Sequence, residues 1–270
     1  MHRRLRRPMH CASPKLARAT KRARHGAREA MRLRSSAVAE RARRHSFGWA
    51  RVTSWHGRHD VAHLVLAEGT PPTRAEVEEC VERLRHAGYT AIVTSALTAA
   101  DSLPFVDSGF GVHERLHLLE HTLDELPMPA ADPPALRRAW RADRSSVLGV
   151  DALAFDAFWR LDPDGLNDAL HATPAVRFRV GDLGSRPVAY AITGRAGRRG
   201  YLQRVAVHPD VRRAGWGRTL VLDALVWLRR HDTQRALVNT QWTNDGALAL
   251  YESCGFRRLP VGLCVLDRDL

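Results

Sequence analysis

Apolar runs of strand length alternate with amphipathic stretches along most of the chain, and this pattern predicts an α/β fold. Thr73 precedes Glu76 at the spacing of a capping box, which predicts the start of a helix. Gly88 is placed to end that helix. The predicted elements of this first segment are a strand at 61–67, the helix, a strand at 90–95, a short helix at 98–108 interrupted by Pro104, and a strand at 112–119.

Four prolines within the nine residues 126–134 predict a linker, and we expect a domain boundary there. The boundary separates a smaller folded segment at 46–125 from a larger one at 135–270. The elements predicted beyond the linker are a strand near 136–141, helices near 144–159 and 164–171, strands at 175–181, 187–193 and 200–207, an amphipathic helix at 215–230, a strand at 235–241, a helix at 244–253 and a strand at 261–267.

Residues 201–217 combine a buried strand, a turn with a proline, and an Arg/Gly loop that leads into a helix. The first turn of a helix has unpaired backbone N–H groups and a partial positive charge, which favour an anion. Gly215 and Gly217 lack a Cβ atom, so an anion can approach this backbone closely. Further positive charge comes from Arg212, Arg213 and Arg218. The loop therefore suits a pyrophosphate, although glycines also serve simply to pack a helix on a sheet.

A second motif follows, with the spacing Asn-x-x-Ala-x-x-Leu-Tyr-x-x-x-Gly-Phe from Asn244 to Phe256. This motif and the loop Arg212-Arg213-Ala214-Gly215-Trp216-Gly217 resemble the two signatures of the GNAT acyltransferase superfamily. The resemblance covers about residues 135–270. It implies an α/β fold with a mixed, mostly antiparallel central sheet flanked by helices, preceded here by a smaller α/β GNAT-like half. It also implies acetyl-CoA as the co-substrate, with no metal.

The resemblance assigns roles to individual residues. The backbone of Val205, Ala206 and Val207 would pair with the pantetheine arm of acetyl-CoA. Asn244 would bind the same arm through its side chain. The pyrophosphate would bind the N–H groups of the loop, namely Arg212, Arg213, Ala214, Gly215, Trp216, Gly217 and Arg218. Tyr251 would be the general acid that protonates the departing thiolate, although without the motif it would read as a core aromatic.

No general base is evident in the sequence. The central strands offer Gln203 and Gln241, neither of which can take a proton. Glu252 is expected to face away from the site and His208 to be structural. A water relay, or an acceptor amine of low pKa, fits this absence. The two early helices bring further carboxyl groups that could line an acceptor pocket, those of Asp156, Asp162 and Asp164.

The first folded segment reads as a degenerate copy of the second. Placing Gly109-Phe110 on Gly255-Phe256 aligns Thr98 with Asn244 and Phe105 with Tyr251. The copy therefore lacks the acid, and it has no Arg/Gly loop. This alignment predicts a tandem arrangement whose first half is non-catalytic, whereas a generic β-α-β-α-β segment is the alternative.

The net charge of +13 belongs to the N-terminal segment. Residues 1–45 hold 15 Lys and Arg against two acids, and residues 46–270 hold 27 basic and 27 acidic residues. The segment is expected to be a disordered tail, or sequence upstream of a start at Met9 or Met31; a basic arm for nucleic acid or ribosomes is the alternative. The neutral body argues against groove binding by the fold itself.

The function that these features predict is transfer of an acetyl group from acetyl-CoA to a primary amine of a small molecule or a protein. A non-catalytic acyl-CoA-binding module and a nucleic-acid-associated protein are the alternatives. The four cysteines, at 11, 80, 254 and 264, have neither CxxC nor zinc-ligand spacing. We expect free thiols, a bacterial protein with a cytoplasmic location, and no membrane partner.

Overall fold

The computed structural model describes residues 47–67, 69 and 71–270, and the predicted basic segment 1–45 lies outside them. Residues Phe47–Leu270 cluster as one unit. Its elements in chain order are β1 (Ala50–Trp55), β2 (Arg58–Leu66), α2 (Arg74–His86), β3 (Ala91–Thr94), α3 (Ala99–Asp107), β4 (Gly111–His121), β5 (Leu136–Arg138), η1 (Arg141–Asp143), α4 (Arg144–Ala154), α5 (Pro163–His171), β6 (Ala175–Leu183), β7 (Arg186–Ala196), β8 (Arg199–Val207), η2 (Pro209–Val211), α6 (Trp216–Arg229), β9 (Arg235–Gln241), α7 (Asp245–Ser253), β10 (Arg257–Arg258) and β11 (Leu263–Asp269).

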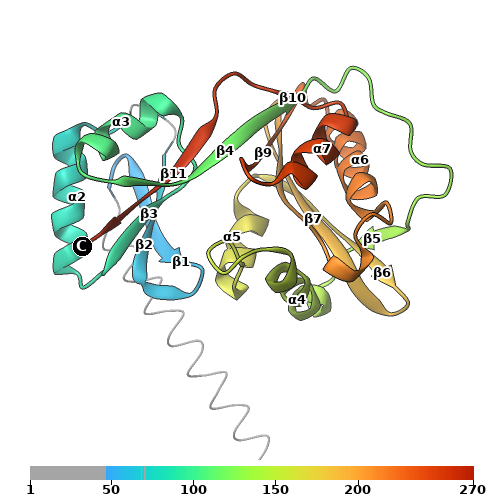
Figure 1. Cartoon of the computed structure of the whole chain (residues 1–270), viewed down its shortest axis with the longest axis horizontal. Helices are drawn as coiled ribbons and strands as arrows, with labels where there is room; N and C mark the ends of the chain where they lie inside the picture. The colour runs from blue at the N-terminus through green and yellow to red at the C-terminus, as the bar shows by residue number, and fades with distance from the viewer. Residues whose placement is uncertain (1–46, 68, 70) are drawn as a thin grey trace, which may run out of the picture. The chain divides into compact units, whose positions relative to one another are not determined.

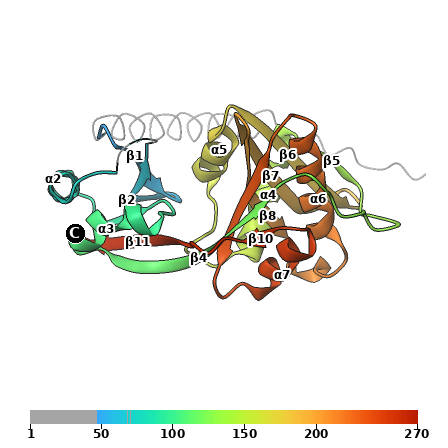
Figure 2. The same ribbon diagram turned by 90° about the horizontal axis from the view of Figure 1, so that it is seen from above.

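The strands of this unit belong to one sheet, which Figures 1 and 2 show from two sides. Its order is β1-β2-β3-β11-β4-β9-β8-β7-β6-β5, and the short β10 pairs with β4. Among the described strands, β2–β3 and β8–β9 pair in parallel and the others pair antiparallel. The predicted mixed, mostly antiparallel sheet flanked by helices is therefore confirmed.

Strand β7 is buried along most of its length because helices cover both of its faces. Tyr190 and Ile192 pack on one face against the core of α4 and α5. Ala189 and Ala191 alternate with them and pack on the other face, under the start of α6. Alternation of side chains along a strand explains why this sequence is apolar without a break.

Helix α2 begins where the capping box predicts. The Thr73 hydroxyl accepts the backbone N–H of Glu76 at 3.3 Å, and the Glu76 carboxylate accepts the backbone N–H of Thr73 at 2.7 Å. Val77, Val81 and Leu84 form the buried face of the helix, in the core that covers β2 and β3. The local sequence signal and the tertiary packing agree here.

Strands β4 and β11 run side by side through the middle of the sheet (Figure 2) and join its two ends. Strand β4 comes before the predicted linker, yet it pairs with β9 from Leu116↔Gln241 to His121↔Ala236. Strand β11 ends the chain, yet it pairs with β3 near the N-terminal end of the sheet. Each segment thus extends the sheet of the other, and residues 126–134 form a loop beside this continuous sheet.

The orders β2-α2-β3-α3-β4 and β8-α6-β9-α7 followed by β11 share local details. Thr98 and Asn244 each cap the following helix by accepting the backbone N–H three residues on, at 3.2 and 3.1 Å. The carbonyls of Phe105 and Tyr251 each accept the N–H of the residue five positions later. These equivalences support the predicted repeat, which stays a prediction together with its domain limits.

Several elements differ from the sequence prediction. Helix α3 runs through Pro104 without interruption. Helix α4 ends at Ala154 and not near 159, because Asp156 accepts the N–H groups of Phe158 and Trp159 and draws the chain into a turn. Strand β1 was not predicted; its hairpin with β2 turns through His56 and Gly57, both at positive φ.

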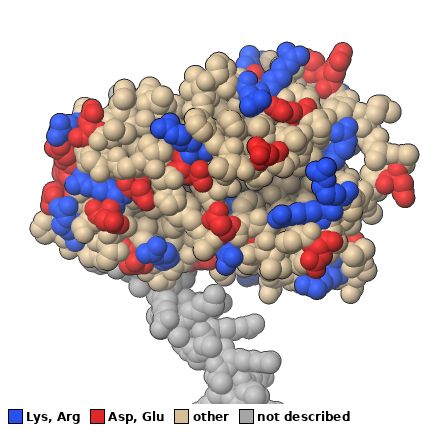
Figure 3. Space-filling model, viewed as in Figure 1, with Lys and Arg blue, Asp and Glu red and all other residues tan. Residues whose placement is uncertain are grey.

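Charges of both signs are interspersed over the face of the unit in Figure 3. This distribution fits the equal numbers of acidic and basic residues in 46–270. In the part of the chain that the structure describes, no helix is long and apolar enough to cross a membrane. No group of three or more potential metal-ligating side chains gathers among the same residues.

Candidate active site

Strands β8 and β9 pair only near their beginnings, where residues 199–201 lie beside residues 235–237. Beyond that point the two neighbours diverge, and a gap opens between them. Strand β8 also carries a β-bulge against β7, in which Gln203 is the extra residue. The divergence and the bulge place an irregular edge of β8 against this gap.

The backbone of β8 offers hydrogen-bonding groups to the gap. The His208 N–H donates to the Val188 carbonyl of β7 at 2.8 Å. Because peptide groups alternate in direction along a strand, those of Ala206 also point to β7, whereas those of Val205 and Val207 point into the gap. An extended polar ligand can therefore pair with Val205 and Val207 as another strand would.

The loop after β8 presents the N-terminus of α6 to the same gap. His208 caps the short helix η2, and the chain then passes through Arg213 at φ 66° and Gly215 at φ 85°. Gly215 is the N-cap residue of α6 and makes no side-chain cap. The first N–H groups of α6 are thus left for an anion, as the sequence predicts.

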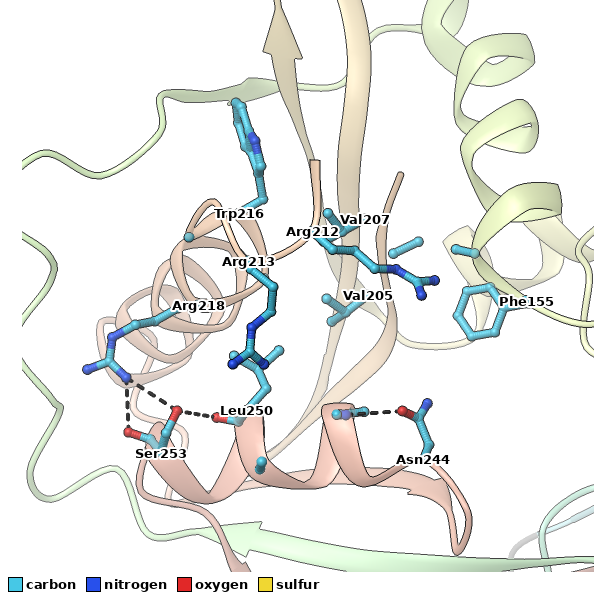
Figure 4. Close-up of a pocket in the computed structure, with 17 residues that line it drawn as sticks. Phe155, Val205, Val207, Arg212, Arg213, Trp216, Arg218, Asn244, Leu250 and Ser253 are labelled. Atoms are coloured by element: carbon cyan, nitrogen blue, oxygen red, sulfur yellow. Dashed lines mark hydrogen bonds between the residues drawn. The ribbon is translucent and has the colours of Figure 1, made fainter. Parts of the chain in front are cut away.

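A cavity of about 650 Å³ lies between β8, the loop that leads into α6, and α7 (Figure 4). Ten of the eleven predicted donor-binding residues line it: Val205, Ala206, Val207, Arg212, Arg213, Gly215, Trp216, Gly217, Arg218 and Asn244. Ala214 is exposed and lies outside this lining. Helix α7 forms the opposite wall through Gly246, Ala247, Ala249, Leu250 and Ser253.

Two of these residues have side chains that interact with other parts of the protein. The Trp216 indole is buried in the apolar core beneath α6 and points away from the cavity in Figure 4, so only its backbone is available to a ligand. The Arg218 guanidinium donates to the Ser253 carbonyl at 3.0 Å and to the Met128 carbonyl at 3.3 Å. Arg212 and Arg213 are exposed and make no salt bridge within the described residues, which leaves their charge for an anion.

A second, smaller cavity of about 180 Å³ adjoins the first. Both cavities are lined by Phe155, Val205, Asn244 and Ala247, so they meet at these residues. Tyr251 lines only the second cavity. Burial raises the pKa of its hydroxyl above the ordinary value, so Tyr251 keeps its proton at neutral pH.

Asn244 stands at the junction of the two cavities as the N-cap of α7. Its side-chain oxygen accepts the Ala247 N–H at 3.1 Å (Figure 4). Its side-chain amide nitrogen donates to no other described residue and remains available to a ligand. The cap fixes the side chain in one orientation, which suits a binding role.

A buried ionic network, which no sequence pattern indicates, lies beside the second cavity. Asp151 is fully buried on α4 and accepts hydrogen bonds from Arg204 Nε at 2.8 Å, Arg204 Nη2 at 3.0 Å, the Leu161 N–H at 2.7 Å and the Tyr190 hydroxyl. Arg204 Nη2 also donates to the Trp159 carbonyl at 2.6 Å. The guanidinium lies 3.4 Å from the centroid of the Phe155 ring. This network ties the loop after α4 to the central strand.

The predicted acceptor-side carboxylates are placed differently from expectation. Asp156 caps the turn at Phe158 and Trp159, and Asp162 caps α5 by accepting the Gly165 N–H at 2.8 Å. Asp164 is exposed. None of the three lines the two cavities described here.

The structure also places the four side chains that were considered for the role of general base. Gln203 and Gln241 line the second cavity. Glu252 binds Arg258 at 2.8 Å, and His208 accepts the Asp210 N–H in its turn. Neither Glu252 nor His208 belongs to the lining of either cavity, as the sequence predicts for both.

Residues 139–256 match the family described as "Acetyltransferase (GNAT) family". This segment contains the elements from α4 to α7, which supply most of the lining of both cavities, and it contains both sequence motifs. Residues 139–256 are a GNAT-family domain.

Solved GNAT structures share the fold over most of this chain. A GCN5-related N-acetyltransferase from Sphaerobacter thermophilus has a TM-score of 0.58 at 15% identity, covering 82% of this chain and 76% of its own. One from Kribbella flavida has a TM-score of 0.55 at 19% identity, covering 76% and 80%. A tandem GNAT protein from the clavulanic acid biosynthesis pathway has a TM-score of 0.56 at 13% identity, covering 82% and 78%. At such identities the likeness shows the fold alone, and it extends beyond the GNAT domain.

Curated relatives match a shorter stretch. The human and mouse proteins named N-alpha-acetyltransferase 30 are each 41% identical over 61 residues, which is 23% of this chain and 17% of theirs. The chain therefore spans less than a fifth of the length of these relatives.

Proposed function

We propose that this protein is an N-acetyltransferase that transfers an acetyl group from acetyl-CoA to a primary amine. The observation that carries this proposal is the joined pair of cavities, which runs from the Arg/Gly loop along the diverging edge of β8 to Tyr251. The 41% identity to N-alpha-acetyltransferases also supports acetyl transfer to an amine. The acceptor is a small molecule or a protein amine.

The residues of the first cavity fit acetyl-CoA. The N–H groups at the start of α6, with Arg212 and Arg213, suit the pyrophosphate. The exposed peptide groups of Val205 and Val207, with the Asn244 amide, suit the amides of the pantetheine arm. Such a path brings the thioester to the junction of the cavities, next to Tyr251.

The second cavity is where the amine would meet the thioester. Attack by a neutral amine breaks the bond between the acetyl carbon and sulfur, and the thiolate then needs a proton. We assign that donation to the protonated Tyr251 hydroxyl. The Asp151–Arg204 network would hold the loop of Phe155 and Trp159 against the site.

The test is the thermal stability of the full chain with and without acetyl-CoA. A ligand that binds only the folded state stabilises it, by about 2.7 kcal/mol at a concentration of 100 times its Kd. Gly217→Glu is expected to abolish this stabilisation, because a Cβ atom there would already lie 3.0 Å from Leu250 Cδ2 and the carboxylate would repel the pyrophosphate. Gly149→Glu is the control, since Gly149 is exposed on α4 with open space around it.

Turnover is measured in parallel, as release of free CoA thiol with a panel of primary amines that includes peptides with free N-termini. Stabilisation by acetyl-CoA without thiol release for any amine would favour an acyl-CoA-binding module instead. No stabilisation at millimolar acetyl-CoA would remove the donor assignment. The cytoplasmic location and the bacterial source stay predictions.

A further inference from the structure

The proposed reaction requires a group that takes a proton from the acceptor. Primary alkylamines are protonated near neutral pH, and only the neutral form can attack a thioester. The second cavity offers Gln203 from β8 and Gln241 from β9, whose amides cannot serve. Arg204 also lines it, with its charge compensated by Asp151.

A carboxylate of β4, the strand that precedes the linker, is hydrogen-bonded to a residue that lines this cavity. Gln241 Nε2 donates to Glu114 Oε2 at 3.1 Å. Gln241 pairs in register with Leu116, and both line the second cavity. Because side chains alternate along a strand, Glu114 lies on the same face of β4 as Leu116. Its carboxylate therefore lies next to the Gln241 amide that lines the cavity, although Glu114 itself is not among the lining residues.

Glu114 is half-buried, and within the described residues no Arg, Lys or His forms a salt bridge with it. Its other oxygen accepts the Arg115 N–H at 3.3 Å. Neighbouring charges are engaged elsewhere: His113 with Asp267 at 2.9 Å, and Arg115 over the Trp242 ring. The carboxylate keeps unused acceptor positions and an uncompensated charge, which a protonated amine would satisfy.

We propose that Glu114 is the general base of the acceptor site, contributed by the exchanged strand β4. This inference rests on the proposed acetyl transfer. The acceptor ammonium binds the Glu114 carboxylate and gives it one proton, and the resulting amine attacks the acetyl carbon. The second nitrogen proton passes to solvent as the amide forms, and the thiolate takes one proton from Tyr251. Glu114 then releases its proton to solvent, and Tyr251 regains one from solvent. Amide, CoA thiol and one proton released to solvent balance the acetyl-CoA and ammonium consumed.

The experiment compares two small acceptors at pH 7, with enzyme-free rates subtracted. Propylamine is protonated at this pH and needs a base, whereas hydroxylamine is neutral and does not. In Glu114→Gln, the new side-chain oxygen can still accept from Gln241, so the cavity keeps its shape. The variant is expected to lower the propylamine rate by about 100-fold or more and to leave the hydroxylamine rate and stabilisation by acetyl-CoA unchanged.

Glu120→Gln is the matched control on the same strand, because Glu120 binds Arg235 at 2.9 Å, a residue that lines neither cavity, whereas Glu114 binds the lining residue Gln241. It is expected to leave both rates unchanged. Equal loss of both rates in Glu114→Gln, or no loss of either, would overturn the assignment. If the wild type binds acetyl-CoA but releases thiol with neither probe nor any amine of the panel, the transferase proposal fails and the role of Glu114 fails with it. If only the base assignment is wrong, the wild type still acetylates both.

Discussion

Replacement of Asp151 by alanine tests whether the buried ionic network holds the loop of Phe155 and Trp159 in place beside the second cavity. The Asp151 carboxylate is fully buried and accepts four hydrogen bonds, two of them from Arg204. Its removal leaves the Arg204 guanidinium, whose side chain is 12% exposed, without a counter-charge. Breaking a buried ion pair in this way costs about 3–5 kcal/mol. For a unit of this size the melting temperature is then expected to fall by about 10 °C.

Urea unfolding followed by tryptophan fluorescence measures this change, since Trp159 belongs to the loop that Arg204 holds. The control is Glu78→Gln, which removes the exposed pair with Arg74 on α2 and is expected to leave the unfolding midpoint unchanged. Acetylation should fall in Asp151→Ala even where the protein is folded, because the loop lines the second cavity. A loss of stability below about 1 kcal/mol would refute the idea that this carboxylate holds Arg204 in place.

Three further changes have defined outcomes. Tyr251→Phe is expected to lower the acetylation rate by about 100-fold and to leave stabilisation by acetyl-CoA unchanged, as thiol release and thermal shift would show. Burial lowers the pKa of His63 from the ordinary 6.5 to about 3. Between pH 6.5 and pH 3, the imidazole therefore binds a proton in the unfolded chain and stays neutral in the folded chain. Stability should therefore fall with decreasing pH in this window, by up to about 1.4 kcal/mol per pH unit, and urea unfolding of His63→Gln should show a shallower slope. Gly181→Ala places a Cβ atom 2.3 Å from Trp216 Cζ3 and is expected to destabilise the fold by about 1–3 kcal/mol and to weaken acetyl-CoA binding, as chemical unfolding and thermal shift would show.

The lining of the first cavity could be predicted from the sequence because its signals are local. The loop at 212–217 is contiguous, and its glycines and arginines act mainly through the backbone and charge of that segment. Asn244 and Tyr251 lie on one short helix, so their spacing fixes where they stand. Ala214 lies outside the lining, and Arg218 differs from its expected role because its side chain binds the end of α7.

The acceptor side could not be predicted because its residues meet only in the folded chain. Asp151 and Arg204 are 53 positions apart, and Glu114 and Gln241 are 127 apart. No periodicity links such residues. The end of α4 at Ala154 also depends on long-range contacts, since Asp151 accepts the Leu161 N–H and Asp156 caps the turn between them. A helix pattern extended to residue 159 therefore missed the loop that lines both cavities.

The position of β4 explains why the proline-rich segment at 126–134 does not delimit the second cavity. Residues 126–134 join two segments along the chain, but β4 lies between β11 and β9, and β11 lies between β3 and β4. Each segment thus completes the sheet of the other. The segment before the linker has no Arg/Gly loop, yet its last strand borders the second cavity through Leu116. Under the proposed function, this segment would therefore contribute to the acceptor site without binding acetyl-CoA.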